Sequence, residues 1–348
     1  MSWQARLQQT LERTWYGGAP VAAWLAVLEL VYGGMLNLRR ALYRARILRP
    51  VRAGVPVVVV GNVTVGGTGK TPLVVALASE LRQRGWSPGI VLRGYGGHVH
   101  GPEIVPHDAD PARYGDEAVL LARSGETPVA VARRRVEGAV LLVAHAGCDV
   151  VISDDGLQHW ALSRDIEIVV IDGQRRLGNG RLLPAGPLRE PAERLASVDF
   201  VIANGPAQVG ELAMRVQGTR AIPLRAPGQA VPLAAFAGKP VHAVAGIGNP
   251  ERFFQMLEGE GIVVQRHALP DHHVFEGQEL EFNDELPVFV TEKDAVKCAA
   301  FAHERAYVVP ADAIVPEVAG GLFATEDLQN AVRSFLTDGP GRATYEGR

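Results

Sequence analysis

A run of four valines, Val57–Val60, leads directly into the glycine-rich stretch Thr64–Thr71, and an amphipathic helical pattern follows at once. This order predicts a buried strand, a flexible loop and a helix N-terminus, an arrangement that binds nucleotide phosphates. Glycines allow backbone N–H groups to close around phosphate oxygens, Lys70 supplies a mobile cation, and the Thr71 hydroxyl is a ligand for Mg²⁺. The chain is therefore expected to bind ATP or GTP.

The loop departs from the common pattern at one position, because Thr64 stands where glycine is usual. Gly66 and Gly67 supply flexibility one turn later, so we interpret the loop as a variant of the phosphate-binding type. The alternative is a glycine-rich turn ahead of an ordinary helix. That alternative is weaker, because glycine, lysine and hydroxyl all fall at positions with a mechanistic purpose.

Strand and helix patterns alternate after residue 55. The alternation predicts an α/β fold with a doubly wound, mainly parallel sheet that binds ligands at the C-terminal ends of its strands. Expected strands span 56–61, 90–93, 127–132, 149–154, 166–172, 198–204, 241–245 and 288–291, and expected helices span 116–123, 134–146, 250–257, 293–300 and 327–336.

With 348 residues, the chain is long enough for two domains. The predicted organisation is an N-terminal helix over 1–36, a nucleotide-binding domain over 37–205, an extended proline-containing connection over 206–240, a second, smaller α/β domain over 241–337 and a polar tail over 338–348. A net charge of −3 gives no sign of nucleic-acid binding. Cys148 and Cys298 lack metal-ligand spacing, which favours free thiols in a reducing compartment.

The N-terminal segment is mostly apolar from Ala19 to Leu36, although Glu29 and two glycines interrupt it, which does not favour a membrane-spanning helix. Six arginines follow, namely Arg39, Arg40, Arg44, Arg46, Arg49 and Arg52. An apolar helix followed by arginines is typical of a helix lying in an anionic membrane surface. A core helix with a solvated basic end accounts for the pattern equally well.

Two adjacent acids, Asp154 and Asp155, follow the apolar strand over 149–152. Phosphate-loop enzymes use an aspartate at the C-terminal end of such a strand to hold Mg²⁺ opposite the loop threonine. Two crowded carboxylates are costly without a cation, which favours a metal-binding role. A helix-capping role explains one of the acids but hardly both.

Three further motifs are ambiguous on their own. Asp116 opens a predicted helix, where an N-cap role is the simpler explanation. The loop over 271–273 contains two histidines without a third metal ligand nearby, so solvated side chains compete with an acid/base element that domain closure would bring to the phosphate site. The loop Gly178–Glu190 carries Arg181 and Arg189, which suit phosphate or carboxylate binding, although a purely structural loop is an equal alternative.

Read in order, the motifs TVGGTGKTP, RGYGG, GDE, SDDGLQH, GNGRLLPAGPLRE, DHH and TEKDAVK resemble those of the tetraacyldisaccharide 4′-kinase family of lipid A biosynthesis, over roughly residues 15–335. The most specific part is DDGLQH followed by GNGRLLPAGPLRE. The resemblance implies transfer of the γ-phosphoryl group of ATP, with Mg²⁺, to the 4′-hydroxyl of a tetraacylated glucosamine disaccharide 1-phosphate. It also implies work at the cytoplasmic face of the bacterial inner membrane, by a peripheral or monotopic protein.

The resemblance assigns roles to residues as well. The triphosphate would be held by Thr64, Val65, Gly66, Gly67, Thr68, Gly69, Lys70 and Thr71, and Lys70 would also act in catalysis. Asp116 matches the family's proposed base, and His272 matches its partner from the other domain. Candidates near Mg²⁺ are Thr71, Asp154 and Asp155. Candidates for substrate contacts are Arg93, Gln158, His159, Asn179, Arg181 and Arg189. Because a sugar hydroxyl is a very weak acid, Asp116 should accept its proton late and mainly orient it.

Two other functions share much of this pattern. A membrane-associated phosphate-loop ATPase that drives a partner's conformational cycle would carry a similar loop and basic helix. A soluble kinase for a small metabolite would bury the N-terminal helix in its core. No obligate protein partner is evident in the sequence, and ATP in preference to GTP follows from the resemblance alone.

Overall fold

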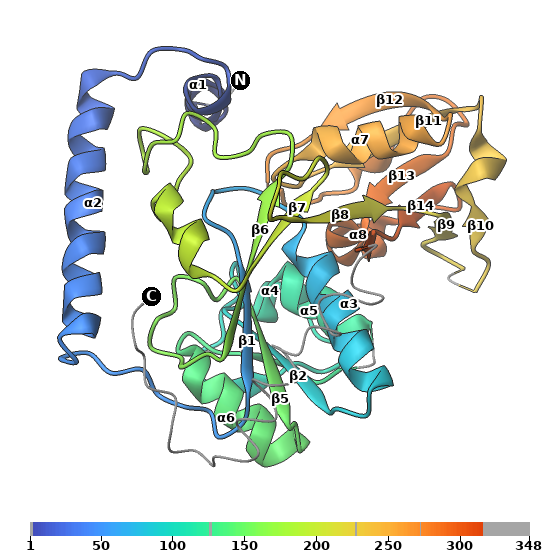
Figure 1. Ribbon diagram of the computed structural model, residues 1–348. Helices are drawn as coiled ribbons and strands as arrows, with labels where there is room; N and C mark the ends of the chain where they lie inside the picture. Colours follow the sequence, from blue (N-terminus) through green and yellow to red (C-terminus); the bar gives the residue numbers. More distant parts are fainter. Residues whose placement is uncertain (1–2, 125–126, 227, 272, 316–348) are drawn as a thin grey trace.

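The computed structural model describes residues 3–124, 127–226, 228–271 and 273–315. His272, the expected helix over 327–336 and the expected tail over 338–348 lie outside this part of the chain. Figure 1 shows two sheet-containing parts beside each other, with the long helix α2 along the side of the larger part.

The larger part is built on a nine-stranded sheet with the order β15-β8-β7-β6-β1-β5-β2-β4-β3. Its strands are β1 (Val57–Gly61), β2 (Pro88–Leu92), β3 (Glu103–Ile104), β4 (Val129–Val131), β5 (Val150–Asp154), β6 (Ile166–Asp172), β7 (Phe200–Asn204), β8 (Leu212–Gln217) and β15 (Asp312–Ile314). Neighbouring strands are parallel except at the two edges, where β3 and β15 are antiparallel to β4 and β8. The predicted mainly parallel sheet is confirmed.

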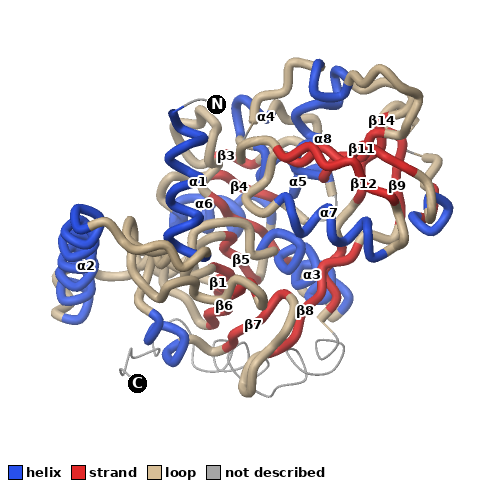
Figure 2. Tube along the Cα trace, turned by 90° about the horizontal axis from the view of Figure 1, so that it is seen from above, coloured by secondary structure: helices blue, strands red, loops and turns tan. Residues whose placement is uncertain are grey.

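Helices cover both faces of this sheet, as in a doubly wound fold. The helices α3 (Lys70–Gln83) and α5 (Asp116–Arg123) pack on one face, and the short helix α4 (Pro111–Tyr114) precedes α5. On the other face lie α6 (Arg135–Ala146) and the loop after β5, with Leu142 and Leu157 in the core. Figure 2 shows β5 of the larger part between α6 and α3.

The smaller part contains a six-stranded sheet with the order β10-β9-β14-β13-β11-β12. Its strands are β9 (Arg220–Pro223), β10 (Val231–Pro232), β11 (Pro240–Ala245), β12 (Val263–Ala268), β13 (Val288–Thr291) and β14 (Ala306–Val309). The helices α7 (Pro250–Gly259) and α8 (Glu292–Cys298) pack into two separate apolar clusters of this sheet. Short 3₁₀ helices are η1 (Ala192–Ser197), η2 (Leu233–Phe236), η3 (Gln278–Leu280) and η4 (Ala299–Phe301).

The segment over 206–240 differs from the predicted extended connection, because it contains strands of both sheets. Strand β8 pairs with β7 of the larger part, whereas β9 pairs with β14 of the smaller part. The prolines that suggested irregular backbone lie where a sheet tolerates them: Pro223 ends β9, and Pro232 belongs to the edge strand β10. The chain returns to the larger part from β14 to β15, so two segments join the parts. The domain boundaries themselves stay predictions.

Two helices precede the first strand, α1 (Trp3–Tyr16) and α2 (Ala23–Arg44). Helix α2 continues beyond the expected end at Leu36, because the arginine cluster begins with residues that favour helix. Its inner side buries Leu25, and large apolar side chains are exposed on its outer apolar face, namely Trp24, Val27, Leu30, Val31, Met35 and Leu38. Among the described residues, no helix combines the length and the apolar character needed to cross a membrane.

Candidate active site

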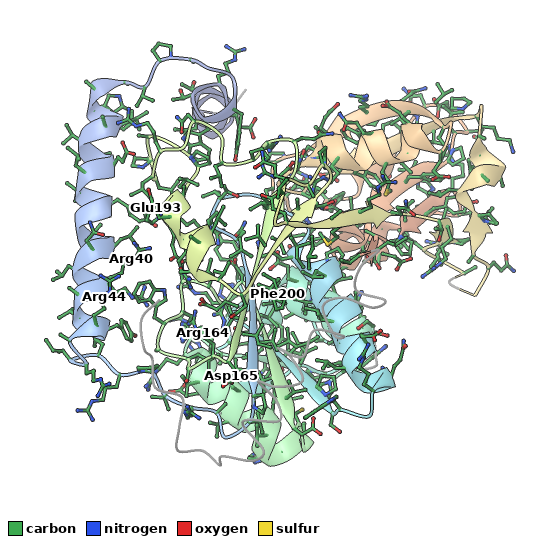
Figure 3. All side chains as sticks on the ribbon, in the orientation of Figure 1. Arg40, Arg44, Arg164, Asp165, Glu193 and Phe200 are labelled. Carbon is green, nitrogen blue, oxygen red and sulfur yellow. The ribbon has the colours of Figure 1, made fainter. Side chains whose placement is uncertain are left out.

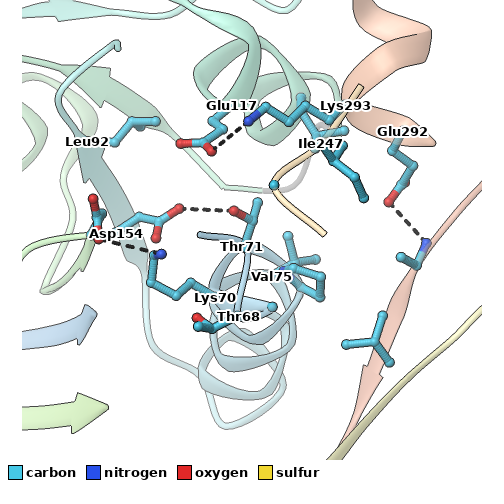
Figure 4. Close-up of a pocket in the computed structure, with 18 of the residues that line it drawn as sticks. Thr68, Lys70, Thr71, Val75, Leu92, Glu117, Asp154, Ile247, Glu292 and Lys293 are labelled. Atoms are coloured by element: carbon cyan, nitrogen blue, oxygen red, sulfur yellow. Dashed lines mark hydrogen bonds and ion pairs between the residues drawn. The ribbon is translucent and has the colours of Figure 1, made fainter. Parts of the chain in front are cut away.

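A cleft of about 1220 Å³ between the two parts contains most of the predicted site residues. The glycine-rich loop lines it from the larger part, and Ile247 and Lys293 line it from the smaller part. Figure 4 shows Lys70 and Thr71 at the start of α3, with Ile247 and Lys293 across from them. Arg39 of α2 also lines the cleft, which therefore extends from the phosphate loop to the N-terminal helix.

The glycine-rich loop joins the end of β1 to the first residue of α3, as the sequence predicts. Gly69 precedes the helix with a φ of 93°, a left-handed conformation that favours glycine. The side-chain amide of Asn204 packs against this glycine and donates a hydrogen bond to the Thr68 carbonyl oxygen at 3.0 Å. The fixed turn brings the side chains of Lys70 and Thr71 into the lining of the cleft.

One predicted loop residue lies away from the cleft. Thr64 is 2% exposed and pairs with Leu188, a residue of the loop after β6. The next residue, Val65, donates its backbone N–H to the Pro187 carbonyl oxygen at 2.8 Å. The threonine at the usual glycine position therefore packs in a short extended pairing, which requires no glycine.

Lys70 is anchored through Asp155. Its Nζ lies 3.5 Å from Oδ1 of Asp155, and Arg189 donates hydrogen bonds to both oxygens of the same carboxylate at 3.0 and 2.9 Å. Burial raises the pKa of Asp155, but Lys70 and Arg189 outweigh burial and lower it to about 2. Asp155 is therefore ionised, and its charge is balanced by side chains of the protein.

Asp154 ends β5 beside Thr71 and is 2% exposed. The Thr71 hydroxyl donates a hydrogen bond to Oδ2 of Asp154 at 3.4 Å. The other oxygen, Oδ1, is buried and has no hydrogen-bond partner among the described residues. Burial, and then the charge of Glu117, raise the pKa of Asp154 to about 7, although Lys70 opposes them. This carboxylate would be ionised at lower cost if a cation lay beside it.

The pair of Asp154 and Thr71 fits Mg²⁺. This ion commonly takes one or two carboxylates from the protein and fills its remaining positions with phosphate oxygens and water. The described residues contain no cluster of three or more metal-ligating side chains, and such a site does not require one.

The first turn of α5 presents two acids to two lysines of α8. Nζ of Lys297 lies 3.9 Å from Oδ2 of Asp116, and Nζ of Lys293 lies 3.3 Å from Oε1 of Glu117. Glu117 and Lys293 line the cleft, whereas the side chain of Asp116, which is 15% exposed, lies just outside the lining. Lys297 also pairs with Asp294 at 2.8 Å. Contacts between the two parts therefore restrain the predicted base.

Four of the six predicted substrate contacts line the cleft, namely Arg93, Gln158, His159 and Arg189. The other two lie away from it. Asn179 donates hydrogen bonds to the carbonyl oxygens of Thr14 and Ala185 at 3.2 and 2.9 Å. Arg181 pairs with Glu29 of α2 at 2.6 Å. These two side chains hold the N-terminal helices against the loop after β6.

Three arginines that were not among the predicted site residues also line the cleft, namely Arg39, which was expected at a lipid surface, Arg133 and Arg135. They belong to no motif, so only the fold brings them to Arg93 and Arg189. Burial, and then Arg135, lower the pKa of His159 to about 4. The neutral ring accepts a hydrogen bond at Nε2 from the backbone N–H of Arg135 at 3.2 Å.

A second missed element links α7 to the phosphate loop. Asp172 at the end of β6 accepts a hydrogen bond from Asn249 at 3.2 Å and pairs with Arg252 at 2.8 Å. Arg252 also donates to the carbonyl oxygens of Thr68 and Asn204 at 3.5 and 3.3 Å. The sequence carries a signal for this contact, because Asp172 ends the predicted strand over 166–172. No binding role was predicted for it.

Comparisons with known proteins agree with this geometry. The chain matches the family model described as tetraacyldisaccharide-1-P 4′-kinase over residues 21–326. A tetraacyldisaccharide 4′-kinase from Alkalilimnicola ehrlichii is 54% identical over 300 residues, which are 83% of this chain and 87% of the relative. One from Xanthomonas euvesicatoria pv. vesicatoria is 50% identical over 316 residues, which are 87% of this chain and 91% of the relative.

A solved structure is similar as well. The crystal structure of LpxK from Aquifex aeolicus, described as an "apo" form in complex with ATP, matches with a TM-score of 0.73 and 26% identity. The match covers 88% of this chain and 98% of that one. The family model spans more than half of the chain, and both sequence relatives are aligned over most of their length. The chain belongs to the tetraacyldisaccharide-1-P 4′-kinase family.

Proposed function

We infer that this protein is an ATP-dependent kinase that transfers the γ-phosphoryl group to the 4′-hydroxyl of a tetraacyldisaccharide 1-phosphate. The observation that carries the inference is a single cleft lined by Lys70 and Thr71 at the phosphate loop and by Arg39 on α2. The cavity thus joins groups suited to a nucleotide donor to a residue of the helix whose outer face is apolar, which suits a kinase with a lipid acceptor.

On the donor side, backbone N–H groups of the glycine-rich loop would surround the phosphates, with Lys70 against the β and γ phosphates. Phosphoryl transfer depends on positioning and charge neutralisation, so the anchoring of Lys70 by Asp155 contributes directly. Thr71 and Asp154 would hold Mg²⁺, because their oxygens lie 3.4 Å apart at the edge of the cleft. Bound there, Mg²⁺ would supply positive charge that neutralises the phosphates.

On the acceptor side, we propose that Asp116 orients the 4′-hydroxyl and accepts its proton late in the reaction. Asp116 begins α5 beside Glu117, which lines the cleft, and Lys297 of α8 restrains it. A shift of α8 against α5 would release the carboxylate toward the cleft, so movement of the smaller part belongs to this proposal. Its proposed partner, His272, lies outside the described residues.

We also propose that the outer apolar face of α2 rests on the cytoplasmic face of the inner membrane. Leu30 is 75% exposed there, and a run of large apolar side chains followed by arginines suits an anionic lipid surface. Leu30→Asp should reduce sedimentation with anionic vesicles. Gln83→Glu adds the same charge at an exposed position of α3, away from α2, and should sediment as the wild type does. Equal sedimentation of both variants would remove α2 from the membrane contact.

The proposed reaction is tested by following the label of γ-labelled ATP with and without the tetraacyldisaccharide 1-phosphate. Label on the disaccharide supports the kinase. Inorganic phosphate released without acceptor labelling, and accelerated by a protein partner, would support the switch ATPase instead. Transfer to a small metabolite with no transfer to the lipid would support the small-metabolite kinase.

A further inference from the structure

The segment Arg181–Glu190, called here the bridging segment, lies between α2 and the glycine-rich loop and contacts both. Figure 3 shows Arg40 on the side of α2 that faces the larger part, where its side chain pairs with Glu190 at 3.5 Å. We propose that Glu29 and Tyr32 of α2 are positioning residues for the phosphate loop. By fixing the bridging segment, they set the geometry in which the loop binds ATP, and the inference rests on the proposed function for the identity of that ligand.

The first link joins α2 to the bridging segment. Glu29 accepts hydrogen bonds from Nε of Arg181 at 2.8 Å and from the backbone N–H of Leu182 at 2.9 Å. The Tyr32 hydroxyl donates to the Arg189 carbonyl oxygen at 2.8 Å. Because residues three apart share one face of a helix, α2 contacts both ends of the segment from a single side.

The second link is the internal structure of the bridging segment. The backbone N–H of Leu183 donates to the Leu188 carbonyl oxygen at 2.9 Å, and that of Leu188 donates to Arg181 at 3.1 Å. Gly186 donates to Leu182 at 2.9 Å. Hydrogen bonds across the fold of the segment connect its two ends, so a displacement at the α2 side is transmitted to the other side.

The third link joins the bridging segment to the glycine-rich loop. The backbone N–H of Arg189 donates to the Val63 carbonyl oxygen at 2.7 Å, and Val65 donates to Pro187 at 2.8 Å. These two hydrogen bonds flank the pairing of Thr64 and form a short ladder, which fixes the path of the chain into the loop.

Side chains reinforce the ladder. Arg189 binds the carboxylate of Asp155, which in turn pairs with Lys70. The neighbouring Glu190 is 1% exposed and accepts a hydrogen bond at 2.9 Å from Gln158, which lines the cleft. The bridging segment therefore reaches the phosphate site through both its backbone and its side chains.

The proposal also accounts for the residue that interrupts the apolar run of α2. A glutamate in a helix that rests on lipid is costly unless it is paired on the protein side. Glu29 is paired in this way, with a charged side chain and a backbone N–H of the bridging segment. Glu29 therefore lies on the side of α2 that contacts the bridging segment, where its charge is paired.

The test uses the full chain in detergent and a fluorescent ATP analogue as the probe. Tyr32→Phe removes one hydroxyl, and Glu29→Gln keeps an acceptor for the backbone N–H while removing the charge opposite Arg181. Each variant should raise the Kd of the analogue and the KM for ATP by about threefold to tenfold, with a smaller change in kcat. Asn37→Ala, an exposed position on α2, is the matched control and should bind as the wild type does.

Amide hydrogen exchange supplies a readout that a general loss of stability would not reproduce. In Tyr32→Phe, the N–H groups of Val65 and Arg189 should exchange faster, while the melting temperature changes little. Wild-type nucleotide affinity in both variants would overturn the proposal. So would a lowered melting temperature without faster exchange at these two amides. The analogue titration and the exchange measurement contain no acceptor, so they test the proposal even if lipid phosphorylation fails, and that failure would count against the proposed function alone.

Discussion

The hydroxyl of Thr71 lies 3.4 Å from the carboxylate of Asp154 and donates a hydrogen bond to it, which joins the first turn of α3 to the end of β5. The carboxylate is buried, and its second oxygen lacks a hydrogen-bond partner in the described part of the chain. Burial of the ionised carboxylate destabilises the folded protein in the absence of a cation, and a cation bound beside it would remove that cost. Two predictions follow from it.

The first concerns stability without Mg²⁺. Burial, and then Glu117, raise the pKa of Asp154 from 3.8 to about 7, so the folded protein holds this proton more tightly than the unfolded chain does. The contribution to stability is fully present below pH 3.8 and is lost as the pH rises through about 7. Asp154→Asn should therefore melt higher than the wild type in EDTA at pH 8, by at least about 2 °C. The difference should shrink toward pH 5, and a difference independent of pH would contradict the assignment.

The second prediction concerns the hydroxyl of Thr71. Thr71→Val keeps the shape of the side chain and removes the oxygen, so kcat/KM at fixed Mg²⁺ should fall by about 10²-fold. Thr71→Ser retains the oxygen and should lie within a few-fold of the wild type. Titration of activity with Mg²⁺ separates the two variants, because only Thr71→Val should require a higher concentration. Equal Mg²⁺ requirements would remove Thr71 from the metal site.

Asp116 gives a third prediction. Asp116→Asn should lower kcat by about 10²–10⁴-fold, because the amide accepts no proton, while ATP binding stays near the wild-type value. Lys297→Met should have a smaller effect on kcat, since Lys297 restrains Asp116 without lining the cleft. Single-turnover rates and nucleotide titrations measure the two effects separately. Wild-type turnover of Asp116→Asn would assign the role of base elsewhere.

The contact between Arg252 and Asp172 gives a fourth prediction. Arg252→Met leaves a buried carboxylate without its cation and should destabilise the protein by about 1–3 kcal/mol, with a higher KM for ATP. Arg266→Met breaks exposed pairs with Glu251 and Glu258 on the same part, and should leave the free energy of unfolding and the KM for ATP near the wild-type values. Urea unfolding and steady-state kinetics test both variants. Equal effects would show that α7 does not support the phosphate loop.

Local patterns predicted much of the larger sheet. The bounds of α5 and β6 agree with the sequence prediction, because a 3.6-residue apolar period and a continuous apolar run are properties of a short stretch of chain. The glycine-rich loop also begins α3 where its lysine predicts. Strands β8 and β12 were missed, since exposed polar residues interrupt their apolar pattern and only pairing with distant strands makes them extended.

The candidate site was predictable where a motif delivers a side chain from the end of a strand, as for Asp154. It was not predictable where two distant segments meet. Asn179 and Arg181 belong to the most specific motif, yet they bind α1 and α2, because the loop after β6 folds against those helices. Arg39 belongs to no motif and still lines the cleft. Such positions depend on tertiary packing, which spacing along the chain does not encode.

The most direct measurement is the position of the new phosphate in the product. Purified protein is incubated with Mg²⁺, ATP and the tetraacyldisaccharide 1-phosphate, and the product is analysed by mass spectrometry and phosphorus NMR. The expected result is one added phosphate, coupled to the proton at the 4′ carbon, which forms much more slowly with Thr71→Val under the same conditions. A phosphate at another position, or ATP hydrolysis without any phosphorylated disaccharide, would contradict the proposed reaction.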